Sequence, residues 1–188
     1  DFLDIHPNTA ICGPKVLNQD GTMQKSCRRG ISRPWAVISY FFMLDKLFPK
    51  IPMFNRYHLG HIDVNEQIPV GGLSGSCMMA RYSVLDSIGN FDEQFFLYQE
   101  DSDLCLRVLS SGWNIDFVPD ATIIHTRGQG GTESNIYRAT LEWHMSYYKL
   151  YRTHFESDYN FIFNMLYYII MTIKLVLAII WLPFRNRL

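Results

Sequence analysis

The sequence predicts an α/β protein that ends in a long hydrophobic helix. Over the first 135 residues, short apolar segments that suit buried strands alternate with segments of helical periodicity. Of the 17 basic residues, all but three lie before residue 161, as do all 18 acidic residues, so the last 28 residues carry positive charge only. This change in charge and hydropathy predicts a boundary between a folded body and a hydrophobic C-terminal segment.

The composition excludes several classes of protein. With 188 residues, 48% of them hydrophobic and 19% charged, the chain can bury a core and is not a disordered tail. A net charge of −1 gives no basic field that would attract nucleic acid. Four cysteines without a CxxC pair argue against a disulfide scaffold or a zinc knuckle and favour a reducing, cytosolic setting. The chain opens with Asp1 rather than methionine, so we expect it to be part of a longer protein.

The N-terminal third begins with residues 1–5, which suit a linker or the end of a helix. Residues 10–17 form an apolar run that indicates a buried strand or a loop. An Asp-Gly pair within residues 18–21 predicts a tight turn, after which residues 22–29 alternate loosely and predict a returning strand. The basic residues of this part predict a solvated edge, or alternatively a patch for phosphate or anionic lipid; they are Lys15, Lys25, Arg28, Arg29 and Arg33.

The central part is apolar and then rich in glycine. Residues 35–48 are predicted to be helical, and residues 49–67 form a loop of about 20 residues, a length that is usually functional or mobile. Residues 68–81 combine a glycine cluster with an apolar strand at residues 77–80. A short helix over residues 82–88 is expected to follow.

A second helix is predicted over residues 100–111, because apolar residues recur there with a spacing of three and four. Gly112 suits the end of that helix. Residues 113–118 alternate and predict a strand that Pro119 stops, and residues 121–125 predict another short strand.

Two helices are expected at the C-terminal end. Residues 135–155 form an aromatic helix, and residues 161–182 form a helix with one charge, Lys174. The second helix would be about 30 Å long, which matches the hydrocarbon core of a bilayer. Membrane contact is the favoured interpretation, and a buried or oligomer-packing helix is the alternative. Basic residues flank both ends, so the sequence does not decide between a span and a helix that lies in the interface.

The strongest functional signal is a cluster of carboxylates. Residues 82–106 contain six acidic residues and no lysine or arginine, and Glu100, Asp101 and Asp103 open the predicted helix. One carboxylate is enough to cap a helix, whereas three crowded ones suit a general base or a site beside a metal ion. His125 ends a predicted strand before a glycine-rich loop; it is either a structural histidine or a site residue at the carboxyl end of a sheet.

Several motifs in one order resemble the family 2 glycosyltransferases. They are GSCMMAR at residues 75–81, IGNFDE at 88–93, FLYQEDSDLCLR at 96–107, Gly112-Trp113, VPDA at 118–121 and His125. The resemblance covers roughly residues 5–135. Within the family, the sequence is most similar to the rhamnosyltransferase-like branch. It implies the C-terminal part of a GT-A domain, a Rossmann-like fold with a mixed sheet, over residues 1–135. An aromatic helical linker (136–160) and a membrane-associated helix (161–188) would follow.

The resemblance also implies roles for particular residues. Asp101, beside Glu100, would be the base that deprotonates the acceptor hydroxyl. The glycine loop near donor and acceptor would contain Gly71, Gly72 and Gly75. His125 would help to hold the metal ion or the donor diphosphate, and Arg127 would bind substrate with weaker support. Within this expectation, Asp101 faces an open pocket.

The function implied is inverting transfer of one sugar, with rhamnose as a candidate, from a nucleotide-sugar donor to a lipid-linked or polysaccharide acceptor. The donor-binding half, about 100 residues with the main ligands of a divalent cation (Mg²⁺ or Mn²⁺), would precede residue 1. The enzyme would work at the cytoplasmic face of the plasma membrane, either peripherally or through a C-terminal anchor, and without nucleic acid. The alternative is a non-catalytic, membrane-anchored scaffold or partner-binding module.

Overall fold

Two long strands, β1 (Thr9–Leu17) and β6 (Asn114–Ile124), run parallel at the centre of a mixed sheet. The computed structural model describes residues 1–126 and 135–185, with side chains up to Pro183. The short strands β3 (Ile68–Pro69) and β5 (Met79–Ala80) pair antiparallel at the two edges, in the order β3-β6-β1-β5. Because β1 has a neighbour on each side, its residues are almost all buried, as its apolar run predicted.

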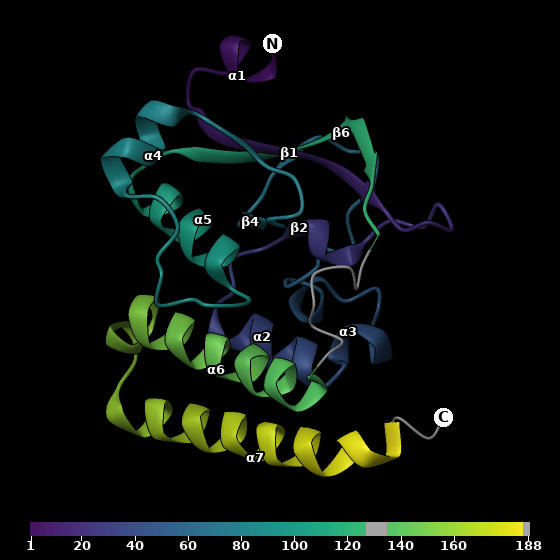
Figure 1. The fold of residues 1–188 in the computed structure, drawn as a ribbon, viewed down its shortest axis with the longest axis vertical. Coiled ribbons are helices and arrows are strands. Elements are labelled where there is room, and N and C mark those ends of the chain that lie inside the picture. Colours follow the sequence, from purple (N-terminus) through teal and green to yellow (C-terminus); the bar gives the residue numbers. More distant parts are fainter. Residues whose placement is uncertain (127–134, 186–188) are drawn as a thin grey trace. The chain divides into compact units, whose positions relative to one another are not determined.

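The remaining elements complete two compact units. The sheet unit comprises residues 1–93 and 100–127, and the helix-pair unit comprises residues 94–99 and 128–188. Besides the strands above, the sheet unit contains α1 (Phe2–Ile5), η1 (Lys25–Cys27), β2 (Arg28–Arg29), α2 (Pro34–Phe41), α3 (Leu44–Leu47), η2 (Pro52–Phe54), β4 (Gly72–Leu73), α4 (Tyr82–Ile88) and α5 (Glu100–Ser110). The helix-pair unit contains α6 (Ile136–His154), η4 (Glu156–Asp158) and α7 (Phe161–Arg185) (Figure 1).

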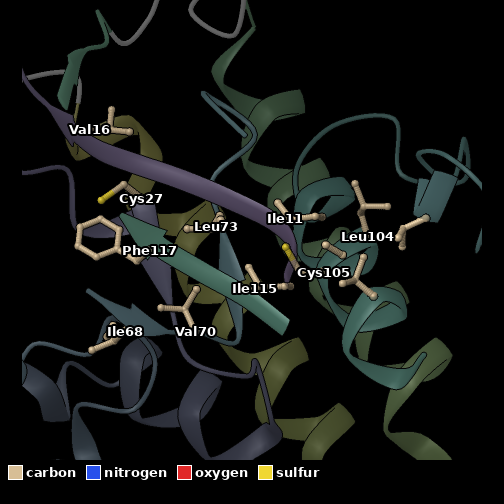
Figure 2. Packing of buried hydrophobic residues seen from close by; sticks show 13 residues of the cluster. Ile11, Val16, Cys27, Ile68, Val70, Leu73, Leu104, Cys105, Ile115 and Phe117 are labelled. Carbon is tan, nitrogen blue, oxygen red and sulfur yellow. The ribbon is translucent and has the colours of Figure 1, made fainter. Parts of the chain in front are cut away.

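The core of the sheet unit lies between the central strands and α5. Figure 2 shows Ile11 of β1 and Ile115 of β6 beside Leu104 and Cys105 of α5, with Leu73 of β4 close to them. All five side chains are at most 3% exposed. The apolar face of α5 predicted this packing, and its burial supplies most of the stability of such a unit. The α/β class, the mixed sheet and the C-terminal apolar helix agree with the prediction and are consistent with a GT-A domain.

Two predicted elements differ in the structure. The expected strands at 113–118 and 121–125 form one strand, because Val118 and Thr122 pair with neighbouring residues of β1 and the residues between them bulge out. Pro119 lies in this bulge, where the ladder requires no backbone N–H from it. The proline therefore does not stop the strand. The expected helix at 35–48 is split into α2 and α3, since Met43 adopts a left-handed conformation with φ 56°.

Residues 22–29 also differ from the returning strand that was predicted. Only Met23 bridges β1, through Leu17, and the chain then forms η1 and the two-residue strand β2, which pairs with β4. The helix α4 has the predicted bounds, and Gly112 ends the helix region with φ 82°, as expected.

The helix-pair unit consists of α6 and α7 running antiparallel, side by side (Figure 1). Tyr151 of α6 stacks on Tyr167 at 3.9 Å between ring centroids, and its hydroxyl bonds Asn164. One turn earlier on α6, the Tyr148 hydroxyl lies 2.5 Å from the Thr172 hydroxyl of α7. The interface between the two helices is therefore aromatic and hydrogen-bonded.

The opposite face of α7 is apolar and exposed. Its large side chains are between 38% and 76% exposed; they include Ile162, Leu166, Ile169, Ile173, Leu177, Ile180 and Trp181. The buried residues Tyr167 and Met171 lie on the other face, with the half-buried Lys174 one turn further on. By length and composition, α7 could cross a membrane, and only 17% of its most apolar window is buried. The exposed stripe thus carries no charge along the length of the helix whose side chains the structure describes.

Candidate functional site

Asp101 lies in the first turn of α5 and is held by two other segments of the sheet unit. Its Oδ2 accepts a hydrogen bond from the backbone N–H of Gly75 at 2.9 Å and forms an ion pair with Nη2 of Arg29, also at 2.9 Å. The other oxygen, Oδ1, accepts a hydrogen bond from the Ser102 hydroxyl at 3.3 Å. The residue is 8% exposed. The expectation that Asp101 faces an open pocket is therefore wrong, because Arg29 and the glycine loop cover one side of the carboxylate.

Arg29 connects three elements of the sheet unit. From β2, its Nη2 also donates to the carbonyl of Leu73 in β4 at 2.6 Å, so one guanidinium bridges β4 and α5. Burial alone would lower the pKa of Arg29, but the net shift is upward because Asp101 stabilises the charged guanidinium. An ion pair with this burial loses several kcal/mol of hydration per ion, and only close geometry offsets that loss. Removing either partner leaves an uncompensated buried charge.

The arginine doublet was not identified from the sequence as part of the site. Both interpretations of the basic residues at 15–33, a solvated edge and a phosphate patch, are wrong for Arg28 and Arg29, which are 1% and 6% exposed. Arg28 donates to the carbonyls of Ile62 and Asp63, and its guanidinium lies over the Phe117 ring at 5.0 Å. The only local signal was two adjacent arginines in an alternating segment, which does not reveal their partners.

The three predicted glycines have different roles in the backbone. A Cβ at Gly71 would lie 2.1 Å from the backbone nitrogen of Ile31, so only glycine permits this approach of the two chains. A Cβ at Gly72 or Gly75 would make only ordinary contacts, the nearest at 3.7 Å and 3.6 Å. Gly75 acts instead through its N–H, which binds Asp101. The structure thus brings Gly75 and Asp101 together and places Gly71 against the chain that follows Arg29.

Glu100 precedes Asp101 and has a different environment. It is half-buried, and its Oε2 has no hydrogen-bond partner among the described residues. Burial raises the pKa of Glu100, and the negative charge of Asp101 raises it further. Tyr98 and Gln99, the two residues before it, both have positive φ, 66° and 64°. Such strain persists only where surrounding structure enforces it, and it is common at functional sites.

Asp103, the third acidic residue of the cluster, has a structural role. It is 1% exposed and forms an ion pair with Arg107, one turn further along α5, at 2.8 Å. Arg107 also donates to the carbonyls of residues 88–90 at the end of α4. This pair joins α4 to α5, so the carboxylate cluster divides into a structural part and the Glu100–Asp101 pair.

His125 lies at the end of β6, where its backbone N–H donates to Leu17 of β1. Its Nδ1 is 3.3 Å from Oε1 of Gln24, and Nε2 of Gln24 donates to the carbonyl of His125 at 2.7 Å. Gln24, which the sequence analysis missed, therefore orients this histidine. Arg127, the remaining predicted site residue, lies outside the described residues.

A divalent cation finds few ligands in the part of the chain that the structure describes. No group of three histidine, cysteine, aspartate or glutamate side chains there could hold a metal ion. His125 could supply one ligand, and its Nδ1 already faces an amide oxygen. Family 2 glycosyltransferases generally use divalent cations, but these described residues do not form a metal site by themselves.

Comparison with known proteins identifies the class of protein. A family model described as glycosyl transferase family group 2 matches residues 27–186, which include β2, the glycine loop, α5 and both C-terminal helices. The match covers most of the chain, and the chain belongs to this family. The resemblance found from the sequence motifs is confirmed.

Curated relatives indicate the branch within the family. The chain is 34% identical over 119 residues to an N-acetylglucosaminyl-diphospho-decaprenol L-rhamnosyltransferase of Mycobacterium tuberculosis, covering 63% of this chain and 38% of the relative. It is 30% identical over 134 residues to rhamnosyltransferase WbbL of Escherichia coli, covering 69% and 47%. It is 37% identical over 129 residues to the low-salt glycan biosynthesis hexosyltransferase Agl10 of Haloferax volcanii, covering 68% and 37%. The chain thus spans less than half the length of each of these relatives.

Proposed function

We propose that this chain is the acceptor-side part of an inverting glycosyltransferase in cell-surface glycan synthesis. It would move a sugar, with rhamnose as the first candidate, from a nucleotide-sugar donor to a hydroxyl of a lipid-linked or polysaccharide acceptor. The printed names of the relatives support the reaction class. The observation that carries the proposal is the junction where Glu100 and Asp101 meet the glycine loop, through Arg29 and the N–H of Gly75.

In this proposal, Asp101 takes the proton from the acceptor hydroxyl. The acceptor oxygen forms a bond to the anomeric carbon from the side opposite the leaving group, so the configuration inverts. The bond from that carbon to the diphosphate breaks, and the nucleoside diphosphate leaves with the electron pair. Arg29 and Gly75 hold Oδ2 at 2.9 Å, whereas Oδ1 has the longer hydrogen bond of 3.3 Å from the Ser102 hydroxyl, so Oδ1 is the oxygen that would accept the proton. Fixing the carboxylate in this way lowers the entropic cost of reaching the reactive geometry.

How the donor is bound is inferred from membership of the glycosyltransferase family. A divalent cation, Mg²⁺ or Mn²⁺, would neutralise the departing diphosphate when bound. We propose that residues outside this chain hold most of it, because the described residues offer His125 without a cluster of ligands around it. Gly71, Gly72 and Gly75 would line the approach to donor and acceptor, with Arg127 as a further contact to substrate.

Membrane association forms part of the proposal. We infer that α7 lies in the interface of the cytoplasmic leaflet with its uncharged stripe toward the acyl chains. Its other face is covered by α6, which carries Arg138, Glu142, Lys149 and Arg152. If α7 spanned the bilayer, its antiparallel partner would bring these charges to the same depth, at a cost of a few kcal/mol for each one near the centre. An in-plane helix avoids that cost and keeps the enzyme near a lipid-linked acceptor.

The test is sugar transfer by the full-length protein, with a panel of nucleotide sugars and a lipid-linked acceptor. Asp101→Asn should lower kcat by about 10²- to 10⁴-fold, the usual contribution of a general base. Asp86→Asn, an exposed carboxylate on α4, serves as the matched control and should leave the rate unchanged. Activity that survives Asp101→Asn would remove the base assignment. Absence of transfer from every donor by the unaltered protein would remove the enzyme assignment.

The second candidate is a non-catalytic scaffold or partner-binding module. The observation that favours it is the burial of Asp101 under Arg29 and the glycine loop, which a purely structural ion pair would also show. The two candidates differ in donor binding. A scaffold would give no saturable binding of any nucleotide sugar to the full-length protein by calorimetry, whereas the enzyme would bind its own donor.

A further inference from the structure

We infer that an exposed apolar and basic segment of the sheet unit, residues 42–56, binds the surface of an anionic lipid bilayer. This segment, called the α3 loop below, runs from the end of α2 through α3 and η2. It exposes large apolar side chains to between 40% and 68%; they are Phe42, Met43, Leu47, Phe48, Ile51 and Met53. Trp35 of α2, 43% exposed, is linked to the segment through its ring contact with Phe54.

The α3 loop is an ordered structure. The side-chain amide of Asn55, which is 6% exposed, donates to the carbonyls of Phe48, Pro49 and Ile51 at 3.0, 3.1 and 3.0 Å. A polar side chain thus forms the centre of the loop, so the apolar side chains are free to point outward. The Phe48 and Phe54 rings pack at 5.2 Å between centroids. The exposed apolar surface is therefore preformed.

Charge distinguishes the kind of partner. The α3 loop carries three exposed basic residues, Lys46, Lys50 and Arg56, and a single acidic one, Asp45. Lysine is depleted at the centre of protein–protein interfaces. In contrast, lysine interleaved with phenylalanine, leucine and tryptophan is typical of segments that lie at a membrane surface. Positive side chains would meet anionic headgroups while the apolar ones enter the boundary with the acyl chains.

This contact is separate from the one proposed for α7. The α3 loop belongs to the sheet unit and α7 to the helix-pair unit, and neither the exposed side chains nor the lysines take part in the Glu100–Asp101 site. A single apolar anchor of moderate strength binds membranes reversibly, and a second signal that includes basic residues makes the attachment stable. The inference does not rest on catalysis.

Two tryptophans report the two surfaces separately. Trp35 lies beside the α3 loop and Trp181 on the exposed stripe of α7. With vesicles of phosphatidylglycerol and brominated phosphatidylcholine, bromine quenches tryptophans that reach the acyl chains. We expect Trp35→Phe to remove one part of the quenchable fluorescence and Trp181→Phe another, whereas Trp113→Phe should remove none. If Trp35→Phe leaves the quenchable fluorescence unchanged while Trp181→Phe removes all of it, the α3 loop does not bind the bilayer.

The contribution of the lysines is measured by co-sedimentation of the protein with the same vesicles. Each basic residue near an anionic surface contributes about fivefold in binding, so Lys46→Gln/Lys50→Gln should weaken binding about thirtyfold. Lys25→Gln, an exposed lysine among the basic residues at 15–33, should have no effect, and a loss as large as that of the double variant would place the lipid contact there and overturn the inference. Equal binding by the double variant and the unaltered protein, or equal binding to neutral vesicles, overturns the inference. Transfer to a soluble acceptor measures the proposed enzyme activity independently of either result.

Discussion

The two units of this protein distribute their polar and apolar side chains differently. In the sheet unit, Ile11, Leu73 and Phe117 are fully buried, and the surface is mixed. In the helix-pair unit, tyrosine hydroxyls and the Asn164 amide lie between α6 and α7, whereas the apolar stripe of α7 faces outward. Both units bury apolar side chains, among them Leu150 and Met171 of the helix pair, but the helix-pair unit also exposes a long apolar stripe along α7.

This difference shows that apolar periodicity predicts a helix face but not what covers it. The apolar face of α5 packs against the sheet, and this contact buries the apolar side chains of the central strands. In α7 hydrogen bonds and ring stacking with α6 use the opposite face. Exposed apolar stripes of this size on soluble domains usually mark an interaction surface. Four predictions follow the contrast between the units, from the largest expected effect to the smallest.

The exposed stripe of α7 should control membrane binding without affecting folding. In Leu166→Gln/Ile173→Gln/Ile180→Gln, three side chains that are more than half exposed become polar. Each would forfeit about 1.5 kcal/mol of transfer free energy, so vesicle binding should weaken by about 4–5 kcal/mol, or roughly a thousandfold. The thermal midpoint should hardly change, because none of the three is buried.

The matched control is Ile5→Gln/Phe91→Gln/Ile124→Gln in the sheet unit, whose three apolar side chains are also more than half exposed. This variant should bind vesicles as the unaltered protein does. Loss of folding in the α7 variant, measured by circular dichroism, would show that the stripe is an interior packed against protein, contrary to the contrast between the units.

Loss of one partner of the buried ion pair should strongly destabilise the sheet unit. Arg29→Met leaves the Asp101 carboxylate buried without its partner, which should lower the free energy of unfolding by about 3–5 kcal/mol. Arg29→Met/Asp101→Asn should recover part of this loss, because no charge is then buried. Urea unfolding at pH 7 measures both variants. A loss below about 1 kcal/mol for the single variant would mean that Asp101 reaches solvent more freely than its 8% exposure indicates.

Two neighbouring glycines should respond differently to the same substitution. Gly71→Ala places a methyl group 2.1 Å from the backbone of Ile31, and the chains must separate at a cost of about 1–3 kcal/mol or more. Gly72→Ala meets nothing closer than 3.7 Å and should change stability by less than about 0.5 kcal/mol. Thermal unfolding of the two variants gives the comparison, and equal midpoints would contradict the close approach of Gly71 to residues 30–31.

Glu100 should make stability fall slightly as the pH rises. Burial first, and then the charge of Asp101, raise the pKa of Glu100 above its ordinary value of 4.5, so the folded state holds this proton more tightly than the unfolded state. The resulting stabilisation is fully present below pH 4.5 and is lost as the pH rises through the folded-state pKa.

Glu100→Gln should therefore abolish the part of the decrease in stability with rising pH that Glu100 causes. Unfolding midpoints measured between pH 4 and 8 would show this. Glu93→Gln, an exposed glutamate outside the site, should leave the profile unchanged. A profile for Glu100→Gln that coincides with that of the unaltered protein would indicate that water solvates the carboxylate in the folded state.

Much of the local structure could be predicted from the sequence, because its causes lie within a few residues. The helix α4 has the predicted bounds, α5 begins at Glu100, and Asn135 caps α6 with its side chain. The motifs of the glycine loop and of α5 also identified the family, which the comparisons confirmed. The predicted roles of Asp101, Glu100, His125 and the glycines remain predictions.

The errors concern pairing between distant segments. The continuity of β6 across Pro119 depends on its register with β1, and Met43 breaks a helix that its neighbours favour. Arg29 joins the site only through Asp101, which is 72 residues away along the chain. No local pattern reports such a partner, because charge pairing in a buried site depends on where the backbone brings the groups.

By itself, the sequence determined the α/β class, most of the helices, the apolar C-terminal segment and the carboxylates at the start of α5, since propensity, periodicity and capping act over short distances. Only the tertiary structure decided that Asp101 is buried against Arg29 and Gly75, and that the stripe on α7 points away from α6. The physical reason is that burial and ion pairing depend on the packing of whole elements, which sums contributions from residues far apart in the chain.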